Sequence, residues 1–218
     1  MMIYLNFHML DTPLTLHHMS ILSVEDTALF ATLVENLYSY EENGAIKIFQ
    51  ENQEQLKTQQ IIVITDILNY DLNNSSLLKR IDQEVIEALN EKPECKTEIE
   101  ALLIQLNKIM REEMVDHELD IEVDDLTIEK LLKELKPRVK RENFLFNKMT
   151  EILDVHRYLN KKGLLIFINT LAYFTDSQRQ NLCEYIFLNN MNVLFLEPHK
   201  IENMEQYYLD KDYFLLKV

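Results

Sequence analysis

The 218-residue sequence predicts an α/β fold, in which a mostly parallel β-sheet domain (the head) carries an inserted α-helical segment (the leg). Three continuous apolar runs, at residues 61–64, 164–168 and 193–196, are typical of parallel strands that are buried on both faces. Between the first two runs the chain has helical periodicity almost throughout. We therefore expect a discontinuous head of residues 1–72 and 163–218, and a helical leg for oligomerisation at residues 73–162.

Further strands and helices are expected in the head. Short apolar stretches predict strands at residues 3–7, 14–16, 46–49 and 213–216. Helical patterns cover residues 24–40 and 176–189, and Asp176 or Ser177 is placed to cap the second of these helices. The chain has only two glycines and four prolines, so we expect few flexible linkers and no glycine-rich binding loop.

The leg is expected to contain four helices, each recognised by apolar positions three and four residues apart. Ser75 and Ser76 can cap the first helix, and Pro93 ends it. The second helix has the widest apolar face, so it should pack along another long helix, and a projecting arm of this kind often serves self-association. Pro137 ends the third helix, and Gly163 follows the fourth. The apolar positions are, in order, Leu78, Ile81, Val85 and Leu89; Ile99, Leu102, Leu103, Leu106, Ile109 and Met110; Leu131, Leu132 and Leu135; and Leu145, Met149, Ile152, His156 and Leu159.

Charge is unevenly distributed along the leg. The formal net charge of the chain is -15, which taken alone argues against a polyanionic partner. However, residues 116–129, the acidic block, contain seven carboxylates and no lysine or arginine. Residues 130–141, the basic block, contain six lysines and arginines and one acid. The distribution of charge along the leg is therefore more informative than the net charge of the chain.

The acidic block is a candidate metal site. Four of its carboxylates alternate with apolar residues, so an extended backbone would project them to one side, and two more can reach back from the start of a helix. This donor set suits a hard cation that takes about six to eight oxygen ligands, although the glycine and ligand spacing of an EF-hand are missing. A solvated acidic edge explains the same pattern equally well. The candidate ligands are Glu118, Asp120, Glu122, Asp124, Asp125 and Glu129.

The basic block also has two interpretations. Cations are favourable near the C-terminus of a helix, so a solvated helix end accounts for it. Alternatively, its side chains contact phosphates, and the lack of nearby aromatic residues then favours a duplex backbone over stacked single strands. The candidate DNA-binding residues are Lys133, Lys136, Arg138, Lys140 and Arg141.

No catalytic constellation is visible, so we expect no enzymatic activity. The run at residues 61–64 leads to Asp66, in the position of a Walker-B acid, but neither glycine precedes a phosphate-binding Lys-Ser or Lys-Thr pair. Asp66 is more simply a polar residue at the end of a strand. Cys95 and Cys183 have no partner at zinc-site spacing, and no long apolar run or signal peptide is present. We therefore expect a soluble cytoplasmic protein without membrane association.

Six further segments are informative together: Phe7–Leu14, Val63–Asp71, Leu89–Glu94, Glu118–Glu122, Leu194–Pro198 and Asp210–Leu215. In these segments the chain resembles a known family, the Csn-two proteins encoded beside the Cas-nine nuclease in type II-A CRISPR loci. The resemblance spans the whole chain at similar length and order. It implies a homotetrameric ring whose α/β heads are related to P-loop ATPases but lack the phosphate loop.

The same resemblance implies function. Carboxylates of the leg would bind Ca²⁺ and support the ring, and the basic lumen would encircle linear double-stranded DNA. Members act in spacer acquisition together with the Cas-one and Cas-two integrase and Cas-nine. The two blocks give these expectations a physical basis. An acidic helical scaffold that binds only proteins, and a residual nucleotide-binding protein, are the alternatives.

Overall fold

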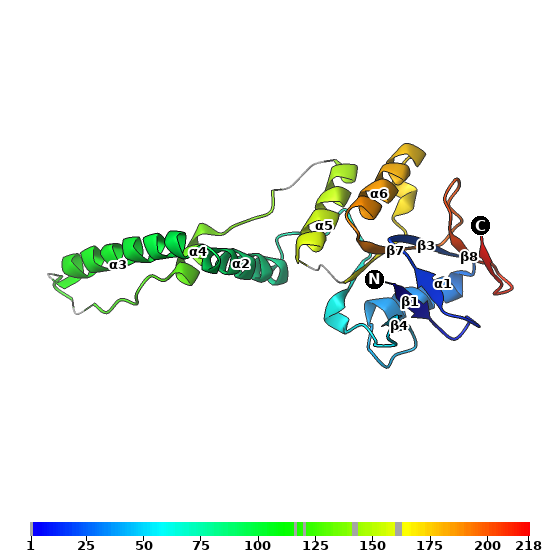
Figure 1. Ribbon diagram of the computed structural model, residues 1–218, viewed down its shortest axis with the longest axis horizontal. Helices are drawn as coiled ribbons and strands as arrows, with labels where there is room; N and C mark the ends of the chain where they lie inside the picture. The colour runs from blue at the N-terminus through cyan, green and yellow to red at the C-terminus, as the bar shows by residue number, and fades with distance from the viewer. Residues whose placement is uncertain (1, 116, 120, 141–143, 160–162) are drawn as a thin grey trace. The chain divides into compact units, whose positions relative to one another are not determined.

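The computed structural model describes residues 2–115, 117–119, 121–140, 144–159 and 163–218, and it confirms the predicted α/β class with a helical insertion (Figure 1). Its chain forms two compact units, a head unit of Met1–Tyr70 with Arg141–Val218 and a helical unit of Asp71–Lys140. The helix α5 (Leu145–Leu159), which the periodicity placed in the leg, falls in the head unit.

The main sheet of the head unit has six strands in the spatial order β5-β6-β7-β3-β8-β9. The first five are mutually parallel, and β9 pairs antiparallel with β8. The fully buried rings of Phe167 and Phe195 stack on adjacent strands, with their centroids 5.4 Å apart. The three continuous apolar runs are thus neighbouring parallel strands, as predicted. The strands are β5 (Ile61–Ile64), β6 (Leu164–Ile168), β7 (Asn192–Glu197), β3 (Met19–Val24), β8 (Tyr207–Leu209) and β9 (Leu215–Lys217).

The central strand β3 was missed by the sequence analysis, as was β8. Two serines interrupt the apolar pattern of β3, yet both are buried. The hydroxyl of Ser23 donates to Oε1 of Gln206 at 2.8 Å, and Ser20 accepts the backbone N–H of His17 at 3.0 Å. The helix expected from residue 24 begins only at Thr27 because residues 19–24 belong to this strand.

Helices cover both faces of the main sheet. Helices α5 and α6 (Asp176–Leu188) lie side by side on one face, and α1 (Thr27–Tyr38) packs on the other (Figure 1). On the α1 side, a small antiparallel sheet shares the same apolar core. The expected cap of α6 was wrong by one position, because Thr175 forms a capping box with Gln178. The remaining elements are β1 (Ile3–Asn6), β2 (Leu14–Leu16), β4 (Lys47–Gln50) and the short 3₁₀ helices η1 (Thr58–Gln60) and η2 (Leu171–Tyr173).

The helical unit contains α2 (Ser75–Asn90), α3 (Pro93–Val115) and α4 (Ile128–Leu135). The cap of α2 is Asn74, whose side chain accepts the backbone N–H groups of Ser76 and Leu77, so the expected cap at Ser75 or Ser76 was wrong. Pro93 does not only follow α2 but opens α3, because proline fits the first turn of a helix, where its missing N–H is not needed.

Two further expectations concern single side chains. His156 is buried on α5, and its Nε2 lies 2.7 Å from the hydroxyl of Tyr70, as expected for a packed histidine. Cys95 and Cys183 are both free and exposed. Among the described helices, none is long and apolar enough to cross a membrane.

Candidate nucleic-acid interface and carboxylate segment

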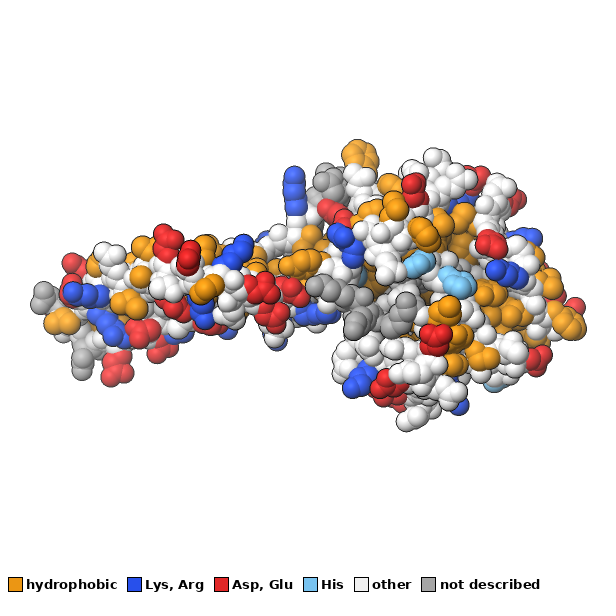
Figure 2. All heavy atoms as spheres, viewed as in Figure 1, with side chains coloured by type: hydrophobic (Ala, Val, Ile, Leu, Met, Phe, Trp, Pro, Cys, Tyr) orange, Lys and Arg blue, Asp and Glu red, His pale blue; other side chains and the backbone are white. Residues whose placement is uncertain are grey.

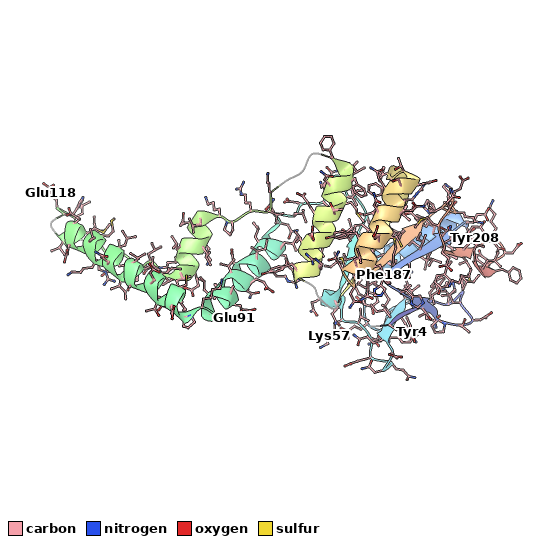
Figure 3. All side chains as sticks on the ribbon, turned by 45° about the horizontal axis from the view of Figure 1, so that its top comes forward. Tyr4, Lys57, Glu91, Glu118, Phe187 and Tyr208 are labelled. Carbon is pink, nitrogen blue, oxygen red and sulfur yellow. The ribbon has the colours of Figure 1, made fainter. Side chains whose placement is uncertain are left out.

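The two charged blocks meet on helix α4 of the helical unit. The segment after α3 contains no helix or strand among its described residues, and α4 starts at Ile128, whose side chain is buried. Thr127 caps this helix by accepting the backbone N–H of Lys130 at 3.4 Å. Figure 3 shows Glu118 beyond the C-terminal end of α3, at the opposite end of that helix from Glu91. The acidic block therefore leads into α4, and the basic block begins on it.

The five described carboxylates of the acidic block are exposed, and two of them are paired with cations. Asp124 lies 3.3 Å from Nζ of Lys130, and Asp125 accepts a hydrogen bond from Nη2 of Arg111 at 2.7 Å. Asp120 and Asp116 lie outside the described residues. Among the residues that are described, no three His, Cys, Asp or Glu side chains gather as a metal site. The described part of the chain therefore holds oxygen donors without gathering three of them at one place.

Glu129 occupies the first turn of α4. The hydroxyl of Thr127 and the backbone N–H of Glu129 itself, with Lys96 and Lys133 nearby, hold the pKa of this carboxyl below its usual range. A carboxylate at the N-terminus of a helix also interacts favourably with the helix dipole. Glu129 is therefore ionised at neutral pH and available as an oxygen donor, while it also stabilises the start of α4.

The basic block continues from α4 into an irregular segment. The helix ends at Leu135, and Lys136 follows in the left-handed conformation with φ of 48°, so the predicted stop before Pro137 is confirmed. Lys133, Lys136, Arg138 and Lys140 are all exposed, and none of them forms an ion pair with a residue in the described part of the chain. Arg141 lies outside the described residues. Four cations are thus available to a ligand.

Two asparagines hold the segments on either side of α4. Asn107 of α3 donates to the carbonyl of Leu126 at 3.1 Å and accepts its N–H at 2.9 Å. Asn73 accepts the N–H of Val139 at 2.8 Å and donates to its carbonyl at 3.2 Å. Sequence reasoning missed both, because an asparagine gives no signal for partners 19 and 66 positions away in the chain.

Helix α3 has an apolar face that the single chain does not cover. Leu103 is buried, but Leu102, Leu106, Ile109 and Met110 are 45–61% exposed, and Figure 2 shows hydrophobic side chains among charged ones along the helical unit. A groove of about 710 Å³ runs between α3 and residues 125–129. The apolar stripe expected to pack along another helix is therefore open to solvent over most of its length.

In the head unit, Asp66 is a turn residue. Its Oδ1 accepts the backbone N–H groups of Leu68 and Asn69 at 2.9 and 3.1 Å, and its Oδ2 accepts the side-chain amide of Asn69 at 2.6 Å. These hydrogen bonds lower the pKa of Asp66, and the bond from the side chain of Asn69 has the largest effect. Two strands, β6 and β7, separate β5 from β3, so Asp66 does not adjoin the connection between β3 and α1.

That connection is where a nucleotide-binding sheet would bind phosphate. It consists of two residues, Glu25 and Asp26, and contains no glycine. The carboxylate of Asp26 accepts the N–H of Leu29 at 2.7 Å, and Glu25 accepts the hydroxyl of Tyr208 and pairs with Lys211 at 3.6 Å. The carboxylate of Asp26 therefore occupies the helix N-terminus that would otherwise attract a phosphate, and a second acid, Glu25, directly precedes it.

Comparison with known proteins decides the family. The model of the family described as CRISPR-associated protein (Cas_Csn2) matches residues 39–213. The chain belongs to the Csn2 family. Two curated Csn2 relatives, each named CRISPR-associated protein Csn2, are similar over nearly their whole length. The protein of Streptococcus agalactiae is 40% identical over 99% of this chain and 98% of the relative, and that of Enterococcus faecalis is 39% identical over 96% of each.

A solved structure supports the fold. The crystal structure of Stu0660 of Streptococcus thermophilus superposes with a TM-score of 0.54, covering 100% of this chain and 76% of that one. At 14% identity this likeness concerns the fold alone. The predicted resemblance to the Csn-two proteins is thus confirmed at the level of family and fold.

Proposed function

We propose that this Csn2 protein is a non-enzymatic ring that binds linear double-stranded DNA without sequence preference, depends on Ca²⁺, and acts in spacer acquisition with the Cas-one and Cas-two integrase and Cas-nine. The observation that carries the proposal is the row of exposed cations at Lys133, Lys136, Arg138 and Lys140, which form no ion pair with any described residue. In a chain of net charge -15, four exposed cations within eight positions are a local concentration of positive charge, and such a concentration suits an anion.

Duplex phosphate is the anion that this surface suits best. Residues 130–141 contain no aromatic side chain on which an unpaired base could stack. Lysine and arginine contacts to phosphates carry no sequence information, so the binding would be independent of sequence and strongly dependent on salt. An encircling ring would in addition require a free DNA end.

The uncovered face of α3 supports the homotetramer. Side chains such as Leu106 and Ile109 would leave water only in contact with another surface, and no described part of the same chain covers them. A second copy of the helical unit supplies a matching apolar face, as symmetric association requires. Assembly through the helical units would leave the head units for other contacts.

We propose that Ca²⁺ is held where acidic blocks of different copies meet. The donors are of the right chemistry, since Ca²⁺ takes carboxylate oxygens, but a single chain does not gather three of them among its described residues. The proposed ligands are unchanged: Glu118, Asp120, Glu122, Asp124, Asp125 and Glu129. Bringing such blocks together without a cation would concentrate negative charge, so Ca²⁺ binding would favour assembly by mass action.

The proposed absence of enzymatic activity is supported by the contacts of three carboxylates in the head unit. Asp66 closes a turn, Asp26 caps α1, and Glu25 pairs with Lys211. ATP turnover that co-purifies with the protein and disappears in Asp66→Ala would overturn this part of the proposal.

DNA binding is tested by the dependence of affinity on salt. Each phosphate contact that is lost should flatten the log-log salt slope by about 0.9. The double variant Lys136→Ala/Lys140→Ala should therefore lower the slope by about 1.8 on any duplex sequence. Lys47→Ala/Lys57→Ala, which removes two exposed lysines of the head unit, is the matched control and should leave the slope unchanged. An unchanged slope in the first variant would place the DNA surface elsewhere.

Two further comparisons separate the ring from a scaffold that binds only proteins. Linear duplex should bind much better than the same DNA as a closed circle. Chelation, or the triple variant Glu118→Ala/Asp120→Ala/Glu122→Ala, should reduce both the sedimenting mass and the affinity for duplex, and Mg²⁺ should substitute poorly because it resists dehydration. If the triple variant keeps Ca²⁺-dependent assembly, the assigned ligands are wrong. If linear duplex does not bind at all, the scaffold interpretation holds instead.

A further inference from the structure

A single side chain controls the shape of the basic segment that follows α4. The amide of Asn73 bonds to both the N–H and the carbonyl of Val139, at 2.8 and 3.2 Å. The N–H and the carbonyl of one residue point to the same edge only when the backbone is extended, as it is in a β-strand. Asn73 therefore acts toward Val139 as a strand partner would, and it fixes the backbone of Val139 as extended.

An extended backbone at Val139 dictates where its neighbours point. Side chains alternate along an extended segment, so residues 138 and 140 project to the side opposite that of Val139. The burial agrees, because Val139 is half-buried whereas Arg138 and Lys140 are exposed. The hydrogen bonds of Asn73 thus present an arginine and a lysine together on one side.

Asn73 is itself held in place. Its backbone N–H donates to Oδ1 of Asp71 at 3.0 Å, and the next residue, Asn74, caps helix α2. Leu72 and Leu77 on either side of this turn are buried. The clamp is therefore anchored in the packed base of α2, whereas the segment that it holds contains no helix or strand of its own.

We infer that Asn73 is a positioning residue for the proposed DNA contact: it sets Arg138 and Lys140 side by side before DNA arrives. This inference rests on the proposed function. A segment that is already ordered does not lose its conformational freedom on binding, so both cations can contact phosphate at a lower entropic cost. Without Asn73, Arg138 and Lys140 remain in the chain but the backbone between them is no longer fixed.

The chain offers a matched control in Asn107. Its side chain makes the same pair of hydrogen bonds to the backbone of Leu126, on the other flank of α4 and outside the basic block. Asn107→Ala should therefore loosen the helical unit about as much as Asn73→Ala does. Leu126 adjoins Asp125, a proposed Ca²⁺ ligand, so both variants are compared in saturating Ca²⁺ and at equal sedimenting mass. Under these conditions only Asn73→Ala should change how the protein contacts DNA.

The clamp itself is tested without DNA. In the wild type the amide hydrogen of Val139 should be protected by its bond to Asn73, and in Asn73→Ala it should exchange with solvent about five- to tenfold faster. Asn107→Ala should leave the exchange of Val139 unchanged and accelerate that of Leu126. Equal exchange of Val139 in the wild type and in Asn73→Ala would overturn the inference directly.

Duplex binding is then measured against salt in five proteins. They are the wild type, Asn73→Ala, Asn107→Ala, Arg138→Ala/Lys140→Ala and the combined variant Asn73→Ala/Arg138→Ala/Lys140→Ala. The Arg138/Lys140 double variant should lower the log-log slope by about 1.8. Its loss of affinity relative to the wild type should therefore be about twelvefold smaller at 200 mM salt than at 50 mM. Asn73→Ala should also lower the slope, and Asn107→Ala should not. The combined variant Asn73→Ala/Arg138→Ala/Lys140→Ala should match Arg138→Ala/Lys140→Ala, because the two effects share one cause.

The outcomes separate the two proposals. If the Arg138/Lys140 variant keeps the wild-type slope, the proposed DNA surface is wrong. If that variant lowers the slope but Asn73→Ala does not, the positioning role is wrong and the proposed function stands. If Asn107→Ala lowers the slope as much as Asn73→Ala, general loosening of the helical unit explains both, and the specific role of Asn73 is overturned.

Discussion

Replacing Leu106 and Ile109 by aspartate should dissociate the proposed assembly. These side chains are 45% and 50% exposed in the single chain, so their uncovered surface adds up to about one complete aliphatic side chain. Burying that surface contributes about 1.5–3 kcal/mol per copy, or about 3–6 kcal/mol for a symmetric contact between two copies. The loss corresponds to a dissociation constant that is weaker by about 10² to 10⁴.

The assay is the mass of the protein by sedimentation over a range of concentrations, in Ca²⁺. Leu106→Asp/Ile109→Asp should shift the distribution toward the monomer while far-ultraviolet circular dichroism stays that of a folded protein. The matched control is Phe187→Asp/Leu188→Asp, which alters two side chains of the head unit that are 62% and 72% exposed. If the α3 variant keeps the mass of the wild type at every concentration, or if only the control dissociates, α3 is not the surface of association.

Three further predictions concern the fold. Lys136→Gly should raise the free energy of unfolding by about 1 kcal/mol, because glycine adopts the left-handed conformation without strain; a decrease in urea titrations would contradict this. Thr175→Ala should lower the free energy of unfolding by about 1 kcal/mol by removing the cap of α6, whereas Thr175→Ser should be nearly neutral. Burial raises the pKa of Glu197 above its ordinary 4.5, so its contribution to stability is present at lower pH and lost as the pH rises from that value through the raised pKa. Glu197→Gln should lose less stability across that window, and parallel pH dependences of the two proteins would refute the reasoning.

The parts of the fold that could be predicted are those whose signal is local. Ile166 and Leu194 belong to continuous apolar runs, and such runs arise wherever helices cover both faces of a parallel sheet. The helices of the insertion follow from apolar spacing in the same way. The existence and type of these elements were therefore accessible, while their ends depend on capping contacts of single side chains. Thr175 and Gln178 did carry the signature of a capping box, which was available in the sequence.

The central strand β3 could not be recognised by apolarity because its polar groups are satisfied at long range. Ser23 is completely buried, and its partner Gln206 lies 183 positions further along the chain. A buried hydroxyl is tolerated once it is hydrogen-bonded, so the rule that interior strands are apolar fails where such a partner exists. No pattern within the strand itself reveals the partner.

In the candidate site, too, local features could be predicted from the sequence and long-range contacts could not. The abutting acidic and basic blocks are visible in the sequence because they are runs of charge. Their pairing is not, since Asp125 pairs with Arg111 of α3 and Asp124 with Lys130. The amide clamps at Asn73 and Asn107 depend on chain segments that only the folded helical unit brings together. Local charge predicted the candidate residues, and tertiary structure determines how their side chains are presented.

The two-residue link between β3 and α1 would make a phosphate-binding loop hard to install at this edge of the sheet. Asp26 supplies, from within the chain, the negative charge that the start of α1 attracts, so an incoming triphosphate would meet repulsion rather than free amide groups. No single substitution restores a phosphate loop, because such a loop needs several inserted residues as well as glycines. Substitutions alone therefore could not turn this edge of the sheet into a P-loop; the backbone itself would have to lengthen.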